Sequence, residues 1–420
     1  MMTGLLVSNF YDKYDWQYML TAHPAKGDER ERQDEIKARY FKILSPDFPE
    51  WITPYLELPL MQRLKGVGLL CGTDWTRLYR NRFYYSRYDH SLGVALIVWH
   101  FTRDKAQTLA GLLHDISTPV FSHVADFRKG DALKQEATEE DNAAIVKRDK
   151  ALAALLEADG LTPEQVADYH QYPVADNEIP QLSADRLEYM FPSGLALDGS
   201  WTFEEIECVY NDLAVLENED GQPELGFRTI AAAEEYTLHF CLIGHILQLN
   251  ENKLCLQLLA EVVKEAIALG LLTEEDTMRL SEAEVMARFE EAALRFETGA
   301  FKAECSENKA PTADKAAAPH AARFSQLYRT YRTMEHIEHV DAPLADAFNI
   351  SMKVKQRYIN PLVQPEGAPK AVRIASVSDK AALYVNDFLT YEDTLYGAVP
   401  YASECACEKK AAAAWQGGQV

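Results

Sequence analysis

Apolar residues recur at helical spacing through most of the chain. The stretch "TLAGLLHDI" (108–116) places leucines and an isoleucine at i, i+3, i+4 and i+7, which form one face of a buried helix. Similar spacing runs through "HSLGVALIVWHF", "LHFCLIGHILQL" and "LCLQLLAEVVKEAIALGLL". The pattern therefore predicts a mainly α protein.

Three stretches depart from this pattern. Residues 1–45 are polar and rich in aromatic residues, with one charged helix expected near 28–43. Residues 302–322 are rich in alanine, lysine and proline, which is typical of a linker. After about residue 345, "ISMKVKQRYINPLV" and "KAVRIASVS" alternate as strands do. We predict an N-terminal extension (1–49), a helical core (50–215), a helical extension of that core (216–300), a linker (301–325), a small C-terminal α/β segment (326–405) and a disordered tail (406–420).

The composition is that of an ordinary globular protein, since 47% of the 420 residues are hydrophobic and 25% are charged. A net charge of −23 argues against binding of nucleic-acid polymers, which require a broad basic surface. The sequence has no apolar run of about 18 residues and no secretory leader at its start, so we expect a cytoplasmic protein without a membrane segment. The seven cysteines are an odd number, and only Cys405 and Cys407 are close together, which favours reduced thiols over a structural zinc site.

One basic stretch interrupts the acidic trend. "TRLYRNRFYYSRYDH" contains Arg77, Arg80, Arg82 and Arg87 within eleven residues. Such a cluster is usually a solvated and partly stacked surface feature. Because it ends directly before His90, a local pocket for a small anion is the alternative.

His114 and Asp115 stand side by side at the end of the apolar repeat. On a helix they lie about 100° apart, so they converge only on a point beyond the side of the helix, such as a metal ion. His90 opens the preceding apolar helix, and Asp185 shares a helical face with Leu182, where an unpaired carboxylate is unfavourable. Two nitrogens and two oxygens suit manganese, iron, cobalt, nickel or zinc better than calcium. A helix cap or a surface ion pair is the simpler interpretation of a lone His-Asp dipeptide, and spacing alone leaves it open.

These motifs, in this order, resemble the HD superfamily of metal-dependent phosphohydrolases. "PLMQRLKGVGLL", "SRYDHSLGVA", "LLHDISTPVFSH" and "SADRLEYM" are similar to the Q-R-L, R-F-x-H-S-x-G-V, L-H-D-x-G-H-x-P-F-S-H and D-x-x-D-Y motifs of the branch that contains the deoxynucleoside triphosphate triphosphohydrolases. "LTEEDTMRLSEAEV" and "VKQRYINPLV" resemble its downstream segments. The resemblance covers about residues 50–300 and, more weakly, 350–385. It implies an HD-domain helical bundle with additional helices.

The resemblance also implies a single divalent transition metal that activates a water molecule or polarises a phosphoryl oxygen. Its ligands would be His90, His114, Asp115 and Asp185.

Five further residues match family positions that act on the substrate. Arg87 matches an arginine that contacts substrate phosphate, for which the planar guanidinium is suited. His123 and Asp126 match positions near the scissile phosphate that take part in catalysis. Arg186 and Tyr189 match positions that face phosphate and sugar. For each of them, helix packing or a surface role is the alternative.

The chain departs from the family motifs after the metal residues. In "HDISTPVFSH", Ser117 replaces the glycine, Thr118 replaces the first following histidine, and Pro119 stands one position early. The downstream His-Glu pair has no histidine here, which removes a proton donor near neutral pH. Its glutamate is assigned to Glu140 in "ATEEDNAAIV", with Gln135 and Glu136 as a second register.

We therefore expect a metal-dependent phosphohydrolase that acts on a nucleotide or another small phosphate ester. The missing histidine keeps a second hypothesis open, in which a catalytically weakened HD domain serves as a nucleotide or metal sensor or as a scaffold. The expected partner is a small phosphorylated substrate, with a nucleotide as the first choice. Since family members often assemble, a homo-oligomer is also expected.

Overall fold

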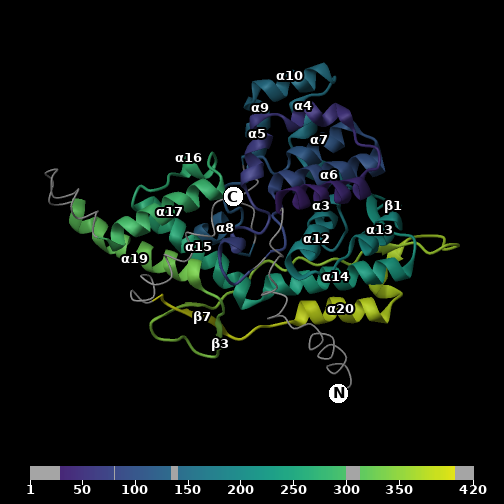
Figure 1. Cartoon of the computed structure of the whole chain (residues 1–420). Helices are drawn as coiled ribbons and strands as arrows, with labels where there is room; N and C mark the ends of the chain where they lie inside the picture. The colour runs from purple at the N-terminus through teal and green to yellow at the C-terminus, as the bar shows by residue number, and fades with distance from the viewer. Residues whose placement is uncertain (1–28, 80, 134–140, 299–312, 403–420) are drawn as a thin grey trace.

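The computed structural model describes residues 29–79, 81–133, 141–298 and 313–402. Within them the fold is mainly α, with two small sheets (Figure 1). None of the helices in these ranges combines the length and the apolar character needed to cross a bilayer. The α-helices are α3 (Glu29–Leu44), α4 (Thr53–Leu56), α5 (Pro59–Gln62), α6 (Arg87–Thr102), α7 (Lys105–Leu113), α8 (Val124–Lys129), α9 (Asn142–Arg148), α10 (Lys150–Ala158), α11 (Pro163–Val166), α12 (Ala184–Ser193), α13 (Phe203–Asn211), α14 (Ile230–Gln248), α15 (Asn250–Ala268), α16 (Glu274–Thr277), α17 (Glu282–Glu297), α19 (Ala313–Thr333) and α20 (Asp379–Thr390). The strands are β1 (Leu213–Glu217), β2 (Pro223–Phe227), β3 (Glu338–Val340), β4 (Ala347–Ile350), β5 (Leu362–Val363), β6 (Val372–Arg373) and β7 (Tyr396–Pro400).

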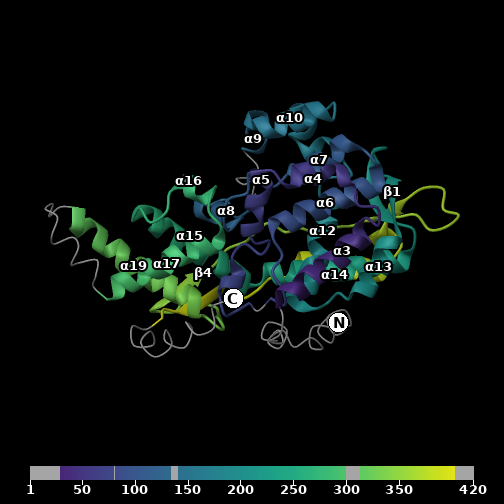
Figure 2. The ribbon, with the colours of Figure 1, turned by 45° about the horizontal axis from the view of Figure 1, so that its top comes forward.

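Two buried hydrophobic clusters organise these elements. The first lies among α3, α6, α7, α12 and α14, with Leu112 and Phe240 fully buried in it. The second lies among α8, α15, α17, α19 and β4 and contains Phe289 and Phe324. Figures 1 and 2 both show α15, α17 and α19 on one side of the molecule, α6, α7 and α12 on the other, and α8 between them. We call the boundary between the two clusters the seam.

Two segments far apart in the sequence cross the seam. The turn after α7 starts at Ile116 in the first cluster and reaches Phe121 in the second. The chain between β4 and β5 crosses in the other direction, with Val354 in the second cluster and Ile359 in the first. Their buried apolar side chains anchor both segments on either side of the seam.

The two sheets connect the C-terminal part of the chain to both clusters. In one sheet, of order β1-β2-β5-β6, the β1–β2 hairpin is antiparallel and β5 pairs with β2 in parallel. In the other, β7 lies between β3 and β4 with antiparallel pairing. Helix α20 packs on α14, and β4 and β7 pack on α15. The C-terminal α/β segment is therefore divided between the two clusters.

The expected charged helix near 28–43 is present as α3. The predicted linker is helical from Ala313 onward, because its last part continues into apolar residues at helical spacing that are buried in the second cluster: Phe324, Leu327, Tyr328 and Tyr331. The β1–β2 hairpin spans the predicted boundary at residue 215 and extends into the region predicted as helices. Its turn is formed by "NEDG", where the side chain of Asn218 accepts two backbone N–H bonds. The predicted tail, 406–420, lies outside the described residues.

Candidate metal centre

Three helix ends bring the four predicted metal ligands together. Helix α6 carries His90 in its first turn, which a capping box closes at the N-terminus. Helix α7 ends directly before His114 and Asp115, and α12 carries Asp185 in its first turn. The polar side chains thus stand where apolar helices end, so that each helix still buries its apolar face.

The four side chains point their ligand atoms at a common centre. His90 Nε2 lies 3.0 Å from Asp185 Oδ1, 3.2 Å from His114 Nε2 and 3.9 Å from Asp115 Oδ2. His114 Nε2 lies 3.5 Å from Asp115 Oδ2 and 3.6 Å from Asp185 Oδ1. The ligand atoms of His90, His114 and Asp115 all lie within 4.8 Å of one another. Asp185, whose side chain is 22% exposed against 11% or less for the other three, occupies the more open side.

The hydrogen bonds of the two imidazoles determine which nitrogen faces the centre. His114 Nδ1 donates to the carbonyl oxygen of Gly111 at 2.7 Å, and His90 Nδ1 bonds the buried carboxylate of Glu188 at 2.6 Å. Both Nε2 atoms are therefore turned inward, only 3.2 Å apart. Two facing lone pairs repel each other unless a proton or a cation lies between them. The donor set therefore fits a divalent metal ion, for which imidazole and carboxylate are the usual ligands.

The charges of the site keep its carboxylates ionised. Burial opposes ionisation of Asp115, but Arg87 and the two imidazoles hold its pKa well below the usual range. Burial likewise opposes ionisation of Asp185, and the hydrogen bond from His90 lowers its pKa. Burial also disfavours the imidazolium form of His90, yet its bonds to Asp185 and Glu188 raise its pKa to about 10. The ionised carboxylates therefore stabilise a positive charge, whether a proton or a cation, at this centre.

Both oxygens of Asp115 are held by side chains of the chain itself. Thr118 donates its hydroxyl to Oδ1 at 2.8 Å, and Arg87 Nη1 donates to Oδ2 at 2.9 Å. Thr118 stands where the family has a histidine. Arg63 holds the turn from beneath by donating to the carbonyl oxygens of Ile116 and Thr118 at 3.1 and 2.6 Å. Arg63 is the arginine of the "QRL" motif, but its role in holding this turn was not predicted from the sequence.

Glu188 is the positioning residue of the centre that sequence reasoning missed. It is fully buried on α12, one turn after Asp185, and it accepts from the Tyr85 hydroxyl at 2.5 Å as well as bonding His90. Gly93 makes room for it, because a Cβ there would lie 2.3 Å from Glu188 Oε1. The only sequence signal was an acidic residue in place of the second aspartate of the D-x-x-D-Y motif.

His123 and Asp126 form a pair next to the metal centre. His123 Nδ1 donates to the fully buried carboxylate of Asp126 at 2.9 Å, and the two residues before His123 have left-handed backbone angles, φ 61° and 49°. Burial, together with the charges of Arg357 and Arg87, lowers the pKa of His123 to about 4 against the opposing effect of Asp126. His123 is therefore neutral at pH 7, with an Nε2 lone pair that can accept a proton.

The three remaining predicted residues, Arg186, Tyr189 and Glu140, differ in their contacts. The guanidinium of Arg186 donates to Gln181 O at 2.9 Å and to the backbone and side-chain oxygens of Asn177, so it is engaged by the loop before α12. Tyr189 lies next to the site, and its buried hydroxyl has no hydrogen-bond partner within the described residues. Glu140 lies outside the described residues.

The predicted arginine cluster does not gather at the centre. Arg77 is partly exposed and pairs with Glu335 at 3.1 Å, Arg82 is exposed, and Arg80 lies outside the described residues. Among the three members of this cluster that the structure describes, only Arg87 is buried beside the metal residues.

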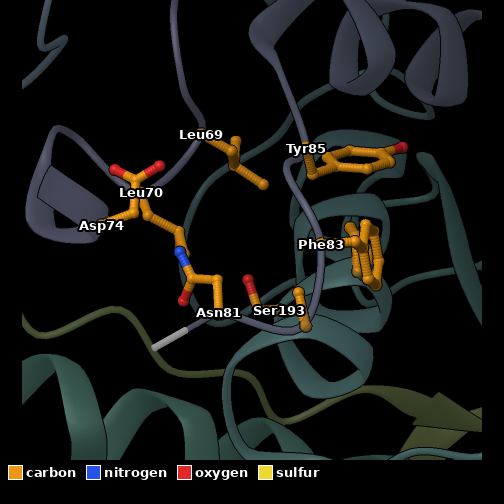
Figure 3. A pocket seen from close by; sticks show the side chains of 9 residues that line it. Leu69, Leu70, Asp74, Asn81, Phe83, Tyr85 and Ser193 are labelled. Atoms are coloured by element: carbon orange, nitrogen blue, oxygen red, sulfur yellow. The ribbon is translucent and has the colours of Figure 1, made fainter. Parts of the chain in front are cut away.

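A small pocket lies behind the metal centre, between the loop of residues 69–85 and the end of α12. Figure 3 shows the ring of Tyr85 along one wall, with its hydroxyl turned away from the pocket. That hydroxyl is the one that bonds Glu188. Asn81 and Ser193 line the opposite side. Tyr85 therefore contacts both the pocket and the support of His90.

Comparison with known proteins adds evidence on the fold and on part of the sequence. No family model matches the chain. It is 30% identical over 133 residues to the uncharacterized protein YdhJ of Bacillus subtilis. The matched residues make up 31% of this chain and 38% of YdhJ. It is also 27% identical over 153 residues to the metal-dependent phosphohydrolase cns2 of Cordyceps militaris. That match makes up 36% of this chain and 43% of cns2. The chain thus spans less than half the length of these curated relatives.

Two solved structures resemble the chain along most of its length. A phosphohydrolase from Bacteroides thetaiotaomicron aligns with a TM-score of 0.52 at 13% identity. The alignment covers 91% of this chain and 97% of the Bacteroides chain. A hypothetical protein from Aquifex aeolicus gives 0.51 at 16% identity, with coverages of 86% and 94%. At this identity the likeness shows the fold. The prediction of a mainly α fold with additional helices and a small C-terminal α/β segment is confirmed, and this architecture is consistent with the expected HD-domain bundle.

Proposed function

We propose that this chain is a metal-dependent phosphohydrolase that holds one divalent transition metal through His90, His114, Asp115 and Asp185. The observation that supports it most is the inward orientation of the two Nε2 atoms, 3.2 Å apart and flanked by both carboxylates. A bound ion of this kind lowers the pKa of a coordinated water and offsets charge on phosphoryl oxygens.

The chain's own residues supply the other requirements of phosphate ester hydrolysis. Arg87 is fixed by its bonds to Asp115 and Ser122, so its guanidinium meets an incoming phosphate without reorganisation. Neutral His123, held by Asp126, presents Nε2 as a proton acceptor, and a bound phosphate anion favours its protonated form. His123 can then return that proton to the departing oxygen.

The basic groups at the centre are few, which supports a small phosphate ester as substrate. The name of cns2, a metal-dependent phosphohydrolase, supports the reaction class. A nucleotide is the substrate we propose first, because the sequence motifs resemble those of nucleotide hydrolases. The net charge of −23 disfavours a polymer.

The test is elemental analysis of protein purified without chelator, followed by a phosphate-release screen across nucleotides and simple phosphoesters. We expect Asp115→Ala to lose both bound metal and activity. Asp47→Ala, which removes a carboxylate whose side chain is 84% exposed, should change neither. Metal-free protein that stays inactive after manganese, iron, cobalt, nickel and zinc are added back would exclude the proposed activity. Metal and nucleotide binding without turnover would instead support a sensor.

A further inference from the structure

Residues 351–361 cross the seam without regular secondary structure, and we call them the strap. Val354 is buried in the second hydrophobic cluster and Ile359 is fully buried in the first. Because these two anchors lie five residues apart on opposite sides of the seam, the residues between them are held over it.

Hydrogen bonds attach the strap to the two elements that carry the site. The Lys355 N–H donates to Ala132 O at 3.2 Å, just beyond α8, the helix that His123 and Asp126 begin. The Asn360 N–H donates to Pro180 O at 2.8 Å, in the loop that leads into α12. The strap is therefore attached beyond the C-terminal end of α8 and to the loop that leads to Asp185.

Arg357 lies between these attachments. Its positive charge disfavours the imidazolium form of His123 and opposes the rise that burial causes in the pKa of Tyr189, so Arg357 lies in the vicinity of both side chains. It is half-buried, and no described residue forms a hydrogen bond or ion pair with its side chain. The chain has 65 acidic and 42 basic residues, yet none of the acidic residues that the structure describes pairs with the side chain of Arg357.

We propose that Arg357 is a substrate-binding residue that donates to the phosphate of the substrate, beside Arg87. This inference rests on the proposed function. The groups around it offer unused hydrogen-bonding capacity, since the buried hydroxyl of Tyr189 has no partner in the described chain. Arg186, which the sequence favoured for this task, already gives its guanidinium to Asn177 and Gln181. A bidentate arginine is the side chain best matched to phosphate oxygens.

The experiment compares the full-length chain, loaded with manganese, with three variants. Arg357→Gln removes the charge, Arg357→Lys keeps the charge without the planar fork, and Lys353→Gln removes a charge from an exposed residue of the same strap. Binding of inorganic phosphate is measured by calorimetry, and KM and kcat are measured with the best ester from the screen. Metal content and melting temperature are checked for each variant.

We expect Arg357→Gln to weaken phosphate binding about 10- to 100-fold and to raise KM in proportion, with metal content and melting temperature unchanged. Arg357→Lys should recover part of the loss, and Lys353→Gln should match wild type. Phosphate affinity within twofold of wild type in Arg357→Gln would overturn the inference, as would a wild-type protein that does not bind phosphate. A wild-type protein that binds phosphate through Arg357 but hydrolyses no ester would refute the proposed function and leave the inference standing.

Discussion

Replacing Gly93 by alanine should destabilise the protein, although the same change usually stabilises the interior of a helix by about 1 kcal/mol. A Cβ at position 93 would lie 2.3 Å from Glu188 Oε1 and 2.7 Å from both Glu188 Cδ and Cγ. The carboxylate and its stem must therefore move by about 1 Å, and overpacking of this kind costs about 1–3 kcal/mol.

The movement also weakens two hydrogen bonds to a fully buried carboxylate. Glu188 is held by His90 at 2.6 Å and by Tyr85 at 2.5 Å, and bonds to charged groups contribute about 1.5–3 kcal/mol each. The overpacking and the partial loss of these bonds destabilise the protein, and the gain in helix propensity offsets about 1 kcal/mol of that cost. We therefore expect Gly93→Ala to lower the free energy of unfolding by about 3 kcal/mol. Since Glu188 orients His90, metal affinity should also fall about 10- to 100-fold.

Urea unfolding followed by circular dichroism measures the stability, and competition with a chelator measures the metal affinity. The double variant Gly93→Ala, Glu188→Asp separates the two effects. Its shorter side chain makes room for the new methyl group, so stability should recover, while the acceptor is drawn away from His90 and metal affinity should stay low. Glu188→Asp alone is the control. A Gly93→Ala protein at least as stable as wild type would refute the packing argument.

Two further predictions concern Thr118 and Glu282. Thr118→Val removes the hydroxyl that holds Asp115 and should lower metal affinity about 10-fold, whereas Thr118→Ser should retain it; equal affinities by chelator competition would deny Thr118 this role. Burial and the charge of Asp74 raise the pKa of Glu282 to about 8, so the folded state holds an extra proton and the free energy of unfolding should fall as pH rises from about 5 to 8. Asp74→Asn should make that fall shallower in urea titrations, and an unchanged slope would contradict the coupling.

The four residues that converge at the centre were named from the sequence through the order of their motifs, because spacing alone left a helix cap or a surface ion pair as the simpler interpretation. The sequence also predicted the mainly α fold, since helical periodicity is a local property. The hairpin and the strap were missed for a physical reason: their partners are distant in sequence. The alternation of residues 351–361 suggested a strand, yet its apolar residues are buried in two different clusters.

The substrate-side residues were harder to assign for the same reason. Arg186 occupies the expected position on α12, but the loop five to nine residues upstream accepts its hydrogen bonds through Gln181 and Asn177. Glu188 looks like a conservative replacement until the contact with His90 and the space left by Gly93 are known. Charge and spacing identify candidates, while tertiary packing decides which of them are already engaged.

The parallel pairing of β2 with β5 has a consequence for folding during synthesis, because the two strands are made at different times. About 135 residues separate Phe227 of β2 from Leu362 of β5, so at about 5–20 residues per second roughly 7–27 seconds pass before the partner strand of β2 is made. All four ligand-bearing residues have been synthesised by then, but one edge of the hairpin is open and can pair with another nascent chain. Until β5 is made, shielding of this edge from other chains favours the native pairing of β2.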